Sequence, residues 1–163
     1  MEKIESRRVR IKWNGPLTTD QLSTCDWTND NRYGLYQIYG HHVVFGAGAL
    51  LYVGMARDQP FATRFAQHAS WLTEEQGITI RLGLIVPEDY AHESPHWTDW
   101  KRLLNDVEAL TIHFHSPPYN SKNISSYRGQ PLLVQNWGNR GSLLPEYSSH
   151  WPPVQRPDDR SET

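Results

Sequence analysis

Two short triplets, Gly34-Leu35-Tyr36 and Tyr52-Val53-Gly54, constrain the fold of this chain more than any other feature of its sequence. Each triplet has the apolar and aromatic residues of a β-strand, and the glycines and histidines between them favour a turn or an irregular loop. We therefore predict a β-hairpin with strands over residues 33–39 and 50–55. This hairpin would carry the two tyrosines on neighbouring strands.

Hydrophobic periodicity predicts the remaining elements. Alternation of apolar with basic or polar residues predicts strands over 8–13 and 78–86, and a late strand is predicted over 131–135. Apolar residues at helical spacing predict helices over 61–72 and 97–115, the second ended by two prolines. This order predicts an α+β fold with a small, mostly antiparallel three-stranded central sheet flanked by helices, and with an extra N-terminal strand.

The composition is that of a polar globular chain of 163 residues, with 37% hydrophobic residues and a mean hydropathy of -0.68. No apolar run approaches the length of a membrane span, and the polar N-terminus lacks the apolar core of a signal peptide. Cys25 is the only cysteine, which excludes an internal disulfide and a cysteine-based zinc site. We therefore expect a cytoplasmic protein.

The charge balance limits the kind of nucleic-acid binding that this chain can support. A net charge of -2 and a pI near 6.4 are not those of a protein that coats nucleic acid non-specifically. The stretch 1–13 is nevertheless locally basic, and it forms either a phosphate-facing edge or an ordinary solvated strand face. The candidate nucleic-acid contacts are Lys12, Lys122, Arg128 and Arg140.

Several polar side chains fit the hydrolysis of a phosphodiester bond, which needs an activated water, a counter-charge, a stabilised leaving oxygen and usually a metal ion. The phenols of Tyr36 and Tyr52 are candidate proton acceptors if cations or a metal lower their pKa. Arg64 supplies a permanent positive charge with forked donors, and His68 follows it one helical turn later. Glu108 on the long predicted helix is a candidate ligand for Mg²⁺, which binds with few carboxylates and several waters.

These residues, in this order, resemble the GIY-YIG nuclease domain. The two triplets stand for the two motifs of that family, with leucine and valine in place of isoleucine. Arg64 followed by His68 resembles the arginine helix of the family, and Glu108 resembles its single metal ligand. Asn120 resembles its polar closing residue, which could orient Glu108 or a catalytic side chain. The resemblance covers residues 33–124.

The resemblance implies a mechanism and a division of the chain. Tyr36 would be the general base on water and Tyr52 its partner, while one Mg²⁺ (or Mn²⁺) held by Glu108 would support the leaving oxygen. Residues 1–32 would form an N-terminal extension, 33–124 the catalytic domain, and 125–163 a C-terminal extension and tail. The implied catalytic residues are Tyr36, Tyr52, Arg64, His68, Glu108 and Asn120.

We therefore expect a metal-dependent endonuclease that hydrolyses DNA. A histidine after the arginine is similar to the restriction-endonuclease branch of the family, and cleavage of a duplex by so small a unit favours a homodimer. Three alternatives stay open: a non-catalytic nucleic-acid-binding module, a structure-selective repair or recombination nuclease, and an RNA-directed nuclease. The tight turn 138–141 either offers backbone amides to phosphate or is a plain loop.

Overall fold

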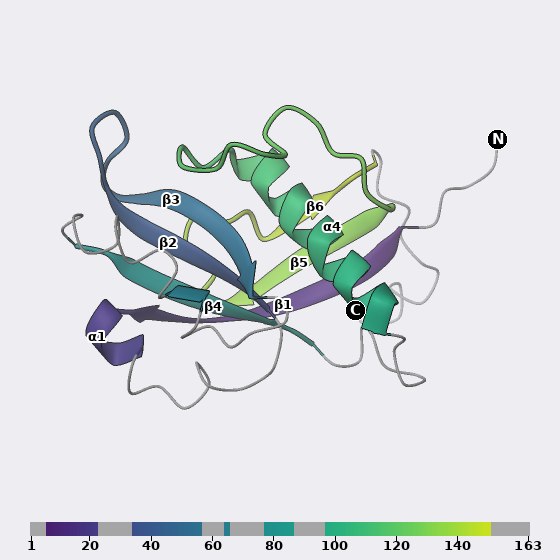
Figure 1. Cartoon of the computed structure of the whole chain (residues 1–163), viewed down its shortest axis with the longest axis horizontal. Helices are drawn as coiled ribbons and strands as arrows, with labels where there is room; N and C mark the ends of the chain where they lie inside the picture. Colours follow the sequence, from purple (N-terminus) through teal and green to yellow (C-terminus); the bar gives the residue numbers. More distant parts are fainter. Residues whose placement is uncertain (1–5, 23–33, 57–63, 66–76, 87–96, 151–163) are drawn as a thin grey trace, which may run out of the picture.

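The computed structural model describes residues 6–22, 34–56, 64–65, 77–86 and 97–150. These ranges contain six strands and one long helix, which lies across the sheet in Figure 1. The elements are β1 (Arg7–Leu17), α1 (Thr19–Leu22), β2 (Gly34–His42), β3 (Gly46–Ala56), β4 (Thr79–Ile85), α4 (Trp97–His115), β5 (Leu132–Gly138) and β6 (Glu146–Ser148). Among the described residues, no helix combines the length and the apolarity needed to cross a membrane.

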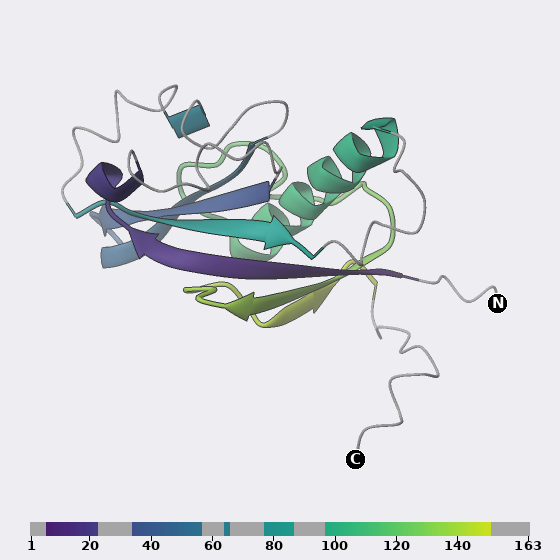
Figure 2. The same cartoon turned by 90° about the horizontal axis from the view of Figure 1, so that it is seen from below.

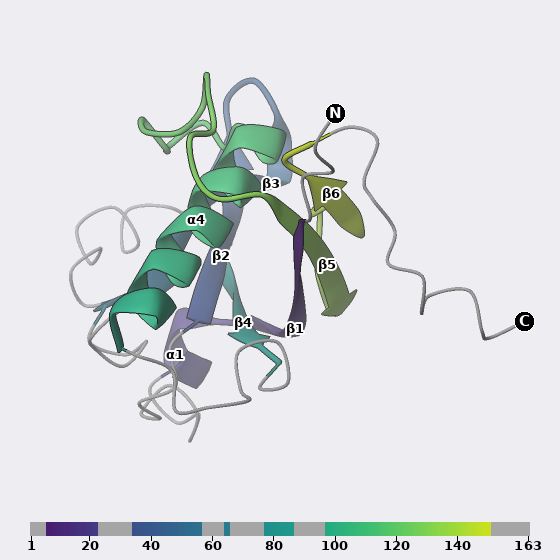
Figure 3. The same cartoon turned by 90° about the vertical axis from the view of Figure 1, so that its right-hand side faces the viewer.

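All six strands belong to one mixed sheet, which curves like half a barrel and has the order β3-β2-β4-β1-β5-β6 (Figure 3). The prediction of a small, mostly antiparallel three-stranded central sheet flanked by helices is therefore wrong. The N-terminal strand is not an addition at the edge either. It lies in the middle of the sheet, antiparallel to β4 on one side and parallel to β5 on the other (Figure 2).

The central place of β1 follows from its alternating side chains. Val9, Ile11 and Trp13 are almost completely buried and pack in one cluster with the apolar side of α4. A strand that buries one face and fills both hydrogen-bonding edges is stable only inside a sheet. The pairing of β1 with β5 is parallel and joins residues more than a hundred positions apart, so local periodicity does not reveal it.

The two faces of the sheet have separate apolar clusters. The larger one lies between the sheet and α4, and a buried polar pair stands within it: the Trp13 indole donates a hydrogen bond to the Asn136 side chain at 2.9 Å. The smaller cluster is on the opposite face and contains Tyr36, Ile38 and Phe65. Tyr36 therefore points away from α4, while its neighbour in sequence packs against that helix.

Several local predictions are confirmed. The long helix has its predicted bounds, 97–115, and the tyrosine triplets lie on two antiparallel strands, β2 and β3. The hairpin strands are longer than predicted and leave only residues 43–45 as a turn. Of the predicted helix 61–72, only Arg64 and Phe65 are described, and both are helical. Strand β6 was not predicted, because its three residues are too few for a periodic pattern.

Candidate active site

The hairpin brings the two motif tyrosines together on one face of the sheet. Tyr36 lies opposite Gly54 in the register of β2 and β3, and Tyr52 lies opposite Ile38. The two tyrosines are thus diagonal neighbours, and their ring centroids are 6.0 Å apart with an interplanar angle of 30°. Diagonal pairs at this separation are within reach of aromatic side chains.

Gly54 is required by the position of the Tyr36 ring. A Cβ atom at position 54 would overlap the end of that ring and would also stand 2.8 Å from Cε1 of Tyr52. The ring of Tyr36 therefore lies directly over the β3 backbone. The second triplet contains glycine because only glycine leaves this space open.

The helical residues 64 and 65 hold Tyr36 from the other side. The Arg64 guanidinium donates a hydrogen bond from Nε to the Tyr36 hydroxyl oxygen at 3.3 Å. The ring of Phe65 meets Tyr36 edge to face, with centroids 4.9 Å apart and an angle of 70°. The contact with Phe65 was not predicted, because helical spacing identified it only as a core residue.

The surroundings of Tyr36 keep its phenol protonated. The side chain is fully buried, and this burial raises the pKa of Tyr36 far above its usual value. The phenol of Tyr52 and the Glu108 carboxylate raise the pKa further, while the charge and hydrogen bond of Arg64 lower it. At neutral pH, Tyr36 is thus a neutral phenol that accepts a hydrogen bond from a cation.

Arg64 stays charged in this partly buried position. Burial alone would lower the pKa of Arg64, but the two tyrosines and Glu108 together outweigh that effect and raise it. The half-buried Glu108 on α4 therefore lies within electrostatic range of both Arg64 and Tyr36. A phenol, a cation and a carboxylate from three separate segments thus interact electrostatically at this hairpin.

Asn120 stabilises the free edge of β3. Its side-chain oxygen accepts a hydrogen bond from the Val53 backbone N–H at 3.0 Å, and its amide nitrogen donates to the Val53 carbonyl at 2.9 Å. The backbone N–H of Tyr119 donates to the carbonyl of Leu51 at 2.9 Å. The expectation was that Asn120 orients Glu108 or a catalytic side chain, whereas the hydrogen bonds of its side chain go to the backbone of the strand that carries Tyr52.

The remaining predicted residues are spread over the chain. His68 lies outside the described residues, so its role stays a prediction. Lys12 is exposed on β1, and Lys122 and Arg128 are exposed between α4 and β5. Arg140 donates from Nε to the carbonyl of Leu143 at 3.1 Å, within its own turn.

The turn that contains Arg140 uses its backbone amides internally. The Asn139 N–H donates to the Trp13 carbonyl at 3.1 Å, and the Arg140 N–H donates to the Gly138 carbonyl at 2.9 Å. These two amides therefore have partners within the protein, which favours the plain-loop interpretation of 138–141 over a phosphate cradle.

Glu108, as a single carboxylate ligand, is compatible with a magnesium-type site. No group of three or more His, Cys, Asp or Glu side chains that could hold a metal occurs in the described parts of the chain. Mg²⁺ keeps several waters and needs only one or two carboxylates, so a single ligand such as Glu108 fits its chemistry, whereas a structural zinc ion would need more protein ligands.

Replacing Gly54 with alanine should destabilise the fold by about 1–3 kcal/mol, because the new methyl group forces the Tyr36 ring out of its position. Urea unfolding would measure the loss. The control is the same substitution in a Tyr36→Ala background, where the overlap with the ring is absent and most of the cost should disappear. Equal destabilisation in both backgrounds would show that Gly54 acts in another way.

No family model, curated protein or solved structure matches this chain.

Proposed function

We propose that this chain is a metal-dependent endonuclease that hydrolyses DNA phosphodiester bonds. The observation that carries the proposal is the hydrogen bond from Arg64 to the buried Tyr36, with Tyr52 packed beside it and Glu108 within electrostatic range. These residues come from a hairpin, a helical turn and a long helix, so their convergence is a property of the tertiary fold.

Arg64 has a side chain whose chemistry suits a phosphate. Its Nε atom donates to the Tyr36 phenol, and a planar, permanently charged guanidinium is the group that binds two oxygens of one phosphate best. A phosphate held in this way lies next to the phenol oxygen. Arg64 then places the scissile group beside the base and offsets the charge that develops on its oxygens.

Hydrolysis at this site proceeds by attack of a water oxygen on phosphorus. The new P–O bond forms as the bond to the leaving oxygen breaks, the ionised form of Tyr36 takes a proton from the water, and solvent protonates the leaving oxygen. Because the pKa of Tyr36 is raised, only a small fraction of the protein has this base ionised at neutral pH.

Glu108 would hold the cation, which we propose to be Mg²⁺ or Mn²⁺. A divalent cation held there would supply positive charge to stabilise the leaving oxygen, and it would offset the effect of the carboxylate on the pKa of Tyr36. Cleavage of both strands of a duplex then calls for two copies of the chain, so we propose a homodimer on the DNA. The single cysteine suits a reducing compartment, so we propose a cytoplasmic protein. The proposed restriction-type role rests on the histidine that follows Arg64 in the sequence.

A second candidate is a DNA-binding module without catalysis. The observation that favours it is the complete burial of Tyr36, because a neutral and buried phenol can act as a structural anchor for Arg64. In that case Arg64 would bind phosphate and no bond would be broken.

Cleavage of supercoiled plasmid separates the two candidates. With Mg²⁺ the protein should convert supercoiled DNA to nicked and linear forms, and with a chelator it should leave the DNA intact. Sequencing of the product ends would show whether cleavage is restricted to defined sites. DNA that binds the protein and stays uncut with both Mg²⁺ and Mn²⁺ would support the binding module instead.

A further inference from the structure

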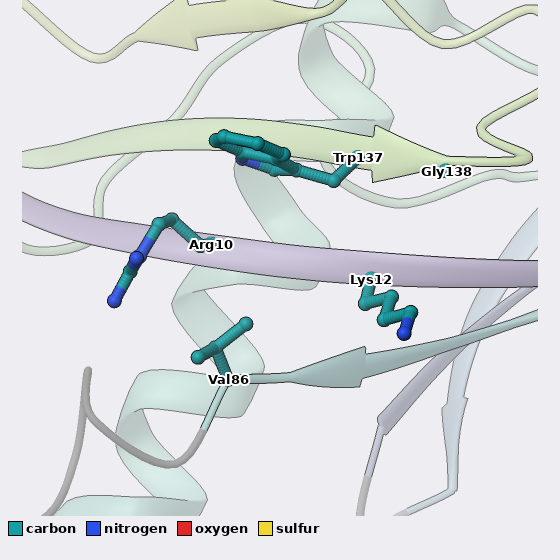
Figure 4. Close-up of a pocket in the computed structure, with 5 residues that line it drawn as sticks. All are labelled: Arg10, Lys12, Val86, Trp137 and Gly138. Carbon is teal, nitrogen blue, oxygen red and sulfur yellow. The ribbon is translucent and has the colours of Figure 1, made fainter.

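A basic groove with an exposed tryptophan lies on the sheet, apart from the tyrosine hairpin. It has a volume of about 330 Å³ and is formed by β1, β5 and the residue that follows β4. Figure 4 shows the two basic side chains of β1 on either side of the valine, with the indole on the neighbouring strand. The residues that line the groove are Arg10, Lys12, Val86, Trp137 and Gly138.

The alternation of side chains explains why the basic residues face this groove. The odd-numbered residues from Val9 to Trp13 point into the cluster under α4, so Arg10 and Lys12 project from the opposite face. In β5, Asn136 is buried and Trp137 faces outward. The parallel register makes Lys12 and Trp137 direct partners on adjacent strands.

Trp137 is unusual because 60% of its surface is exposed. An indole is a large apolar group, and a flat ring that is left open beside two cations offers one face for stacking and nearby charges for an anion. A nucleotide carries both of the groups that such a site can bind, because its sugar links a flat nucleobase to a charged phosphate. The groove is therefore complementary to a nucleotide strand in both shape and charge.

We propose that this groove binds single-stranded DNA. One base stacks on Trp137, and the adjoining backbone phosphates lie beside Lys12 and Arg10. The strand must be unpaired because bases in a duplex stack on one another and do not present their faces to a side chain. The groove volume is also at the low end of that of small-ligand pockets, which suits one nucleotide rather than a helix.

The groove and the tyrosine hairpin share one face of the sheet. Lys12 is paired with Leu84, which is paired with Gly34 on β2, so the row through Trp137 runs next to the row through Tyr36. Three strand spacings, or about 14 Å, separate Trp137 from Gly34 across the sheet, and Tyr36 lies two residues further along β2. A strand bound at Trp137 could be the strand that is cleaved at Tyr36, and this link rests on the proposed function. The binding of single-stranded DNA to the groove does not rest on it.

Among the described residues, the acidic Glu146 on β6 lies beyond the Arg10 end of the groove. Gln135 lies between Arg10 and β6, and it donates from its amide to the Glu146 carboxylate at 2.8 Å. This charge repels phosphate at that end. A bound strand is thus directed along β1, past Arg10 and Lys12, rather than across β5 toward β6.

Fluorescence anisotropy with a labelled oligothymidine of about 12 nucleotides, in the presence of a chelator, tests the proposal. Trp137→Ala should weaken binding by about 5- to 100-fold, while Trp137→Phe, which keeps an aromatic face, should stay within about 3-fold of wild type. Phe45→Ala is the matched control, because Phe45 is 65% exposed at the tip of the β2–β3 hairpin. Equal affinity of wild type and Trp137→Ala, or equal losses in Trp137→Ala and Phe45→Ala, would overturn the proposal.

The salt dependence of the affinity for single-stranded DNA tests the contribution of the basic side chains in the groove. Lys12→Gln should reduce the slope of log affinity against log salt by about 0.7, the value of one phosphate contact on a single strand. Tighter binding of duplex DNA or of oligouridine than of oligothymidine would overturn the assignment to single-stranded DNA. These measurements need no cleavage, so a protein that binds through Trp137 but never cuts DNA would refute the proposed function alone.

Discussion

Replacing Glu108 with glutamine should reduce Mg²⁺-dependent cleavage by about a thousand-fold while the protein remains folded. Glutamine keeps the size of this half-buried side chain but cannot supply the negative charge that holds a divalent cation. Lewis-acid stabilisation of a phosphoryl transition state is worth several kcal/mol, which corresponds to a loss of this order. Single-turnover cleavage of a labelled duplex, with thermal unfolding as the check on folding, would measure the effect.

Asp106→Asn is the matched control for this variant. Asp106 lies on the same helix and is also half-buried, but its carboxylate accepts hydrogen bonds from Gln130, which an asparagine oxygen can still accept. Both variants remove one negative charge from α4, and only Glu108→Gln should lose cleavage. Binding of DNA in chelator should be as tight or tighter in Glu108→Gln, because a charge that repels phosphate is gone. A parallel loss of binding and cleavage would indicate a structural role for Glu108.

The local features of this fold could be predicted, because they depend on residues that are close in sequence. The tyrosine hairpin and the long helix 97–115 both follow from periodicity and from turn-forming residues. The sheet order could not be predicted. It depends on the pairing of β1 with β5, two strands that are far apart in the sequence. Apolar residues of both strands pack together with α4 in one cluster, and no local sequence pattern shows that these three elements meet.

The candidate site, like the fold, could be predicted only in part from the sequence. The order of Tyr36, Arg64 and Glu108 suggested that they act together, and the structure places them within hydrogen-bonding or electrostatic range. The sequence did not reveal that Tyr36 is fully buried. Nor did it reveal that Gly54 makes room for that ring, or that Asn120 binds the backbone of β3. The burial of a side chain and its hydrogen bonds to a strand edge both depend on residues that are distant in the sequence, and the spacing of motifs does not identify these residues.

The burial of Tyr36 also determines how cleavage should depend on pH if Tyr36 is the general base, as proposed. A phenol that is stabilised in its neutral form is ionised only rarely, so the rate of a reaction that needs its ionised form must depend steeply on pH. Below the pKa of a base, the ionised fraction rises tenfold for each pH unit. The raised pKa of Tyr36 extends this rise through the whole range in which DNA and protein are stable.

The wild-type cleavage rate should therefore increase about tenfold per unit between roughly pH 6 and 9 under single-turnover conditions. The same shift in the pKa of Tyr36 sets the upper limit of the experiment. Above about pH 10, the unfolded chain releases its phenol proton more readily than the folded one, so the folded state loses stability as the pH rises.

Tyr36→Phe should lower the rate at neutral pH by about a hundred- to ten-thousand-fold and remove its dependence on pH, because phenylalanine keeps the ring contact with Phe65 but has no proton to exchange. Tyr52→Phe is the control on the neighbouring strand, and it should retain the wild-type slope. A slope that survives in Tyr36→Phe and vanishes in Tyr52→Phe would make Tyr52 the base. The buried hydroxyl of Tyr36 would then serve only to hold Arg64 in place for the phosphate.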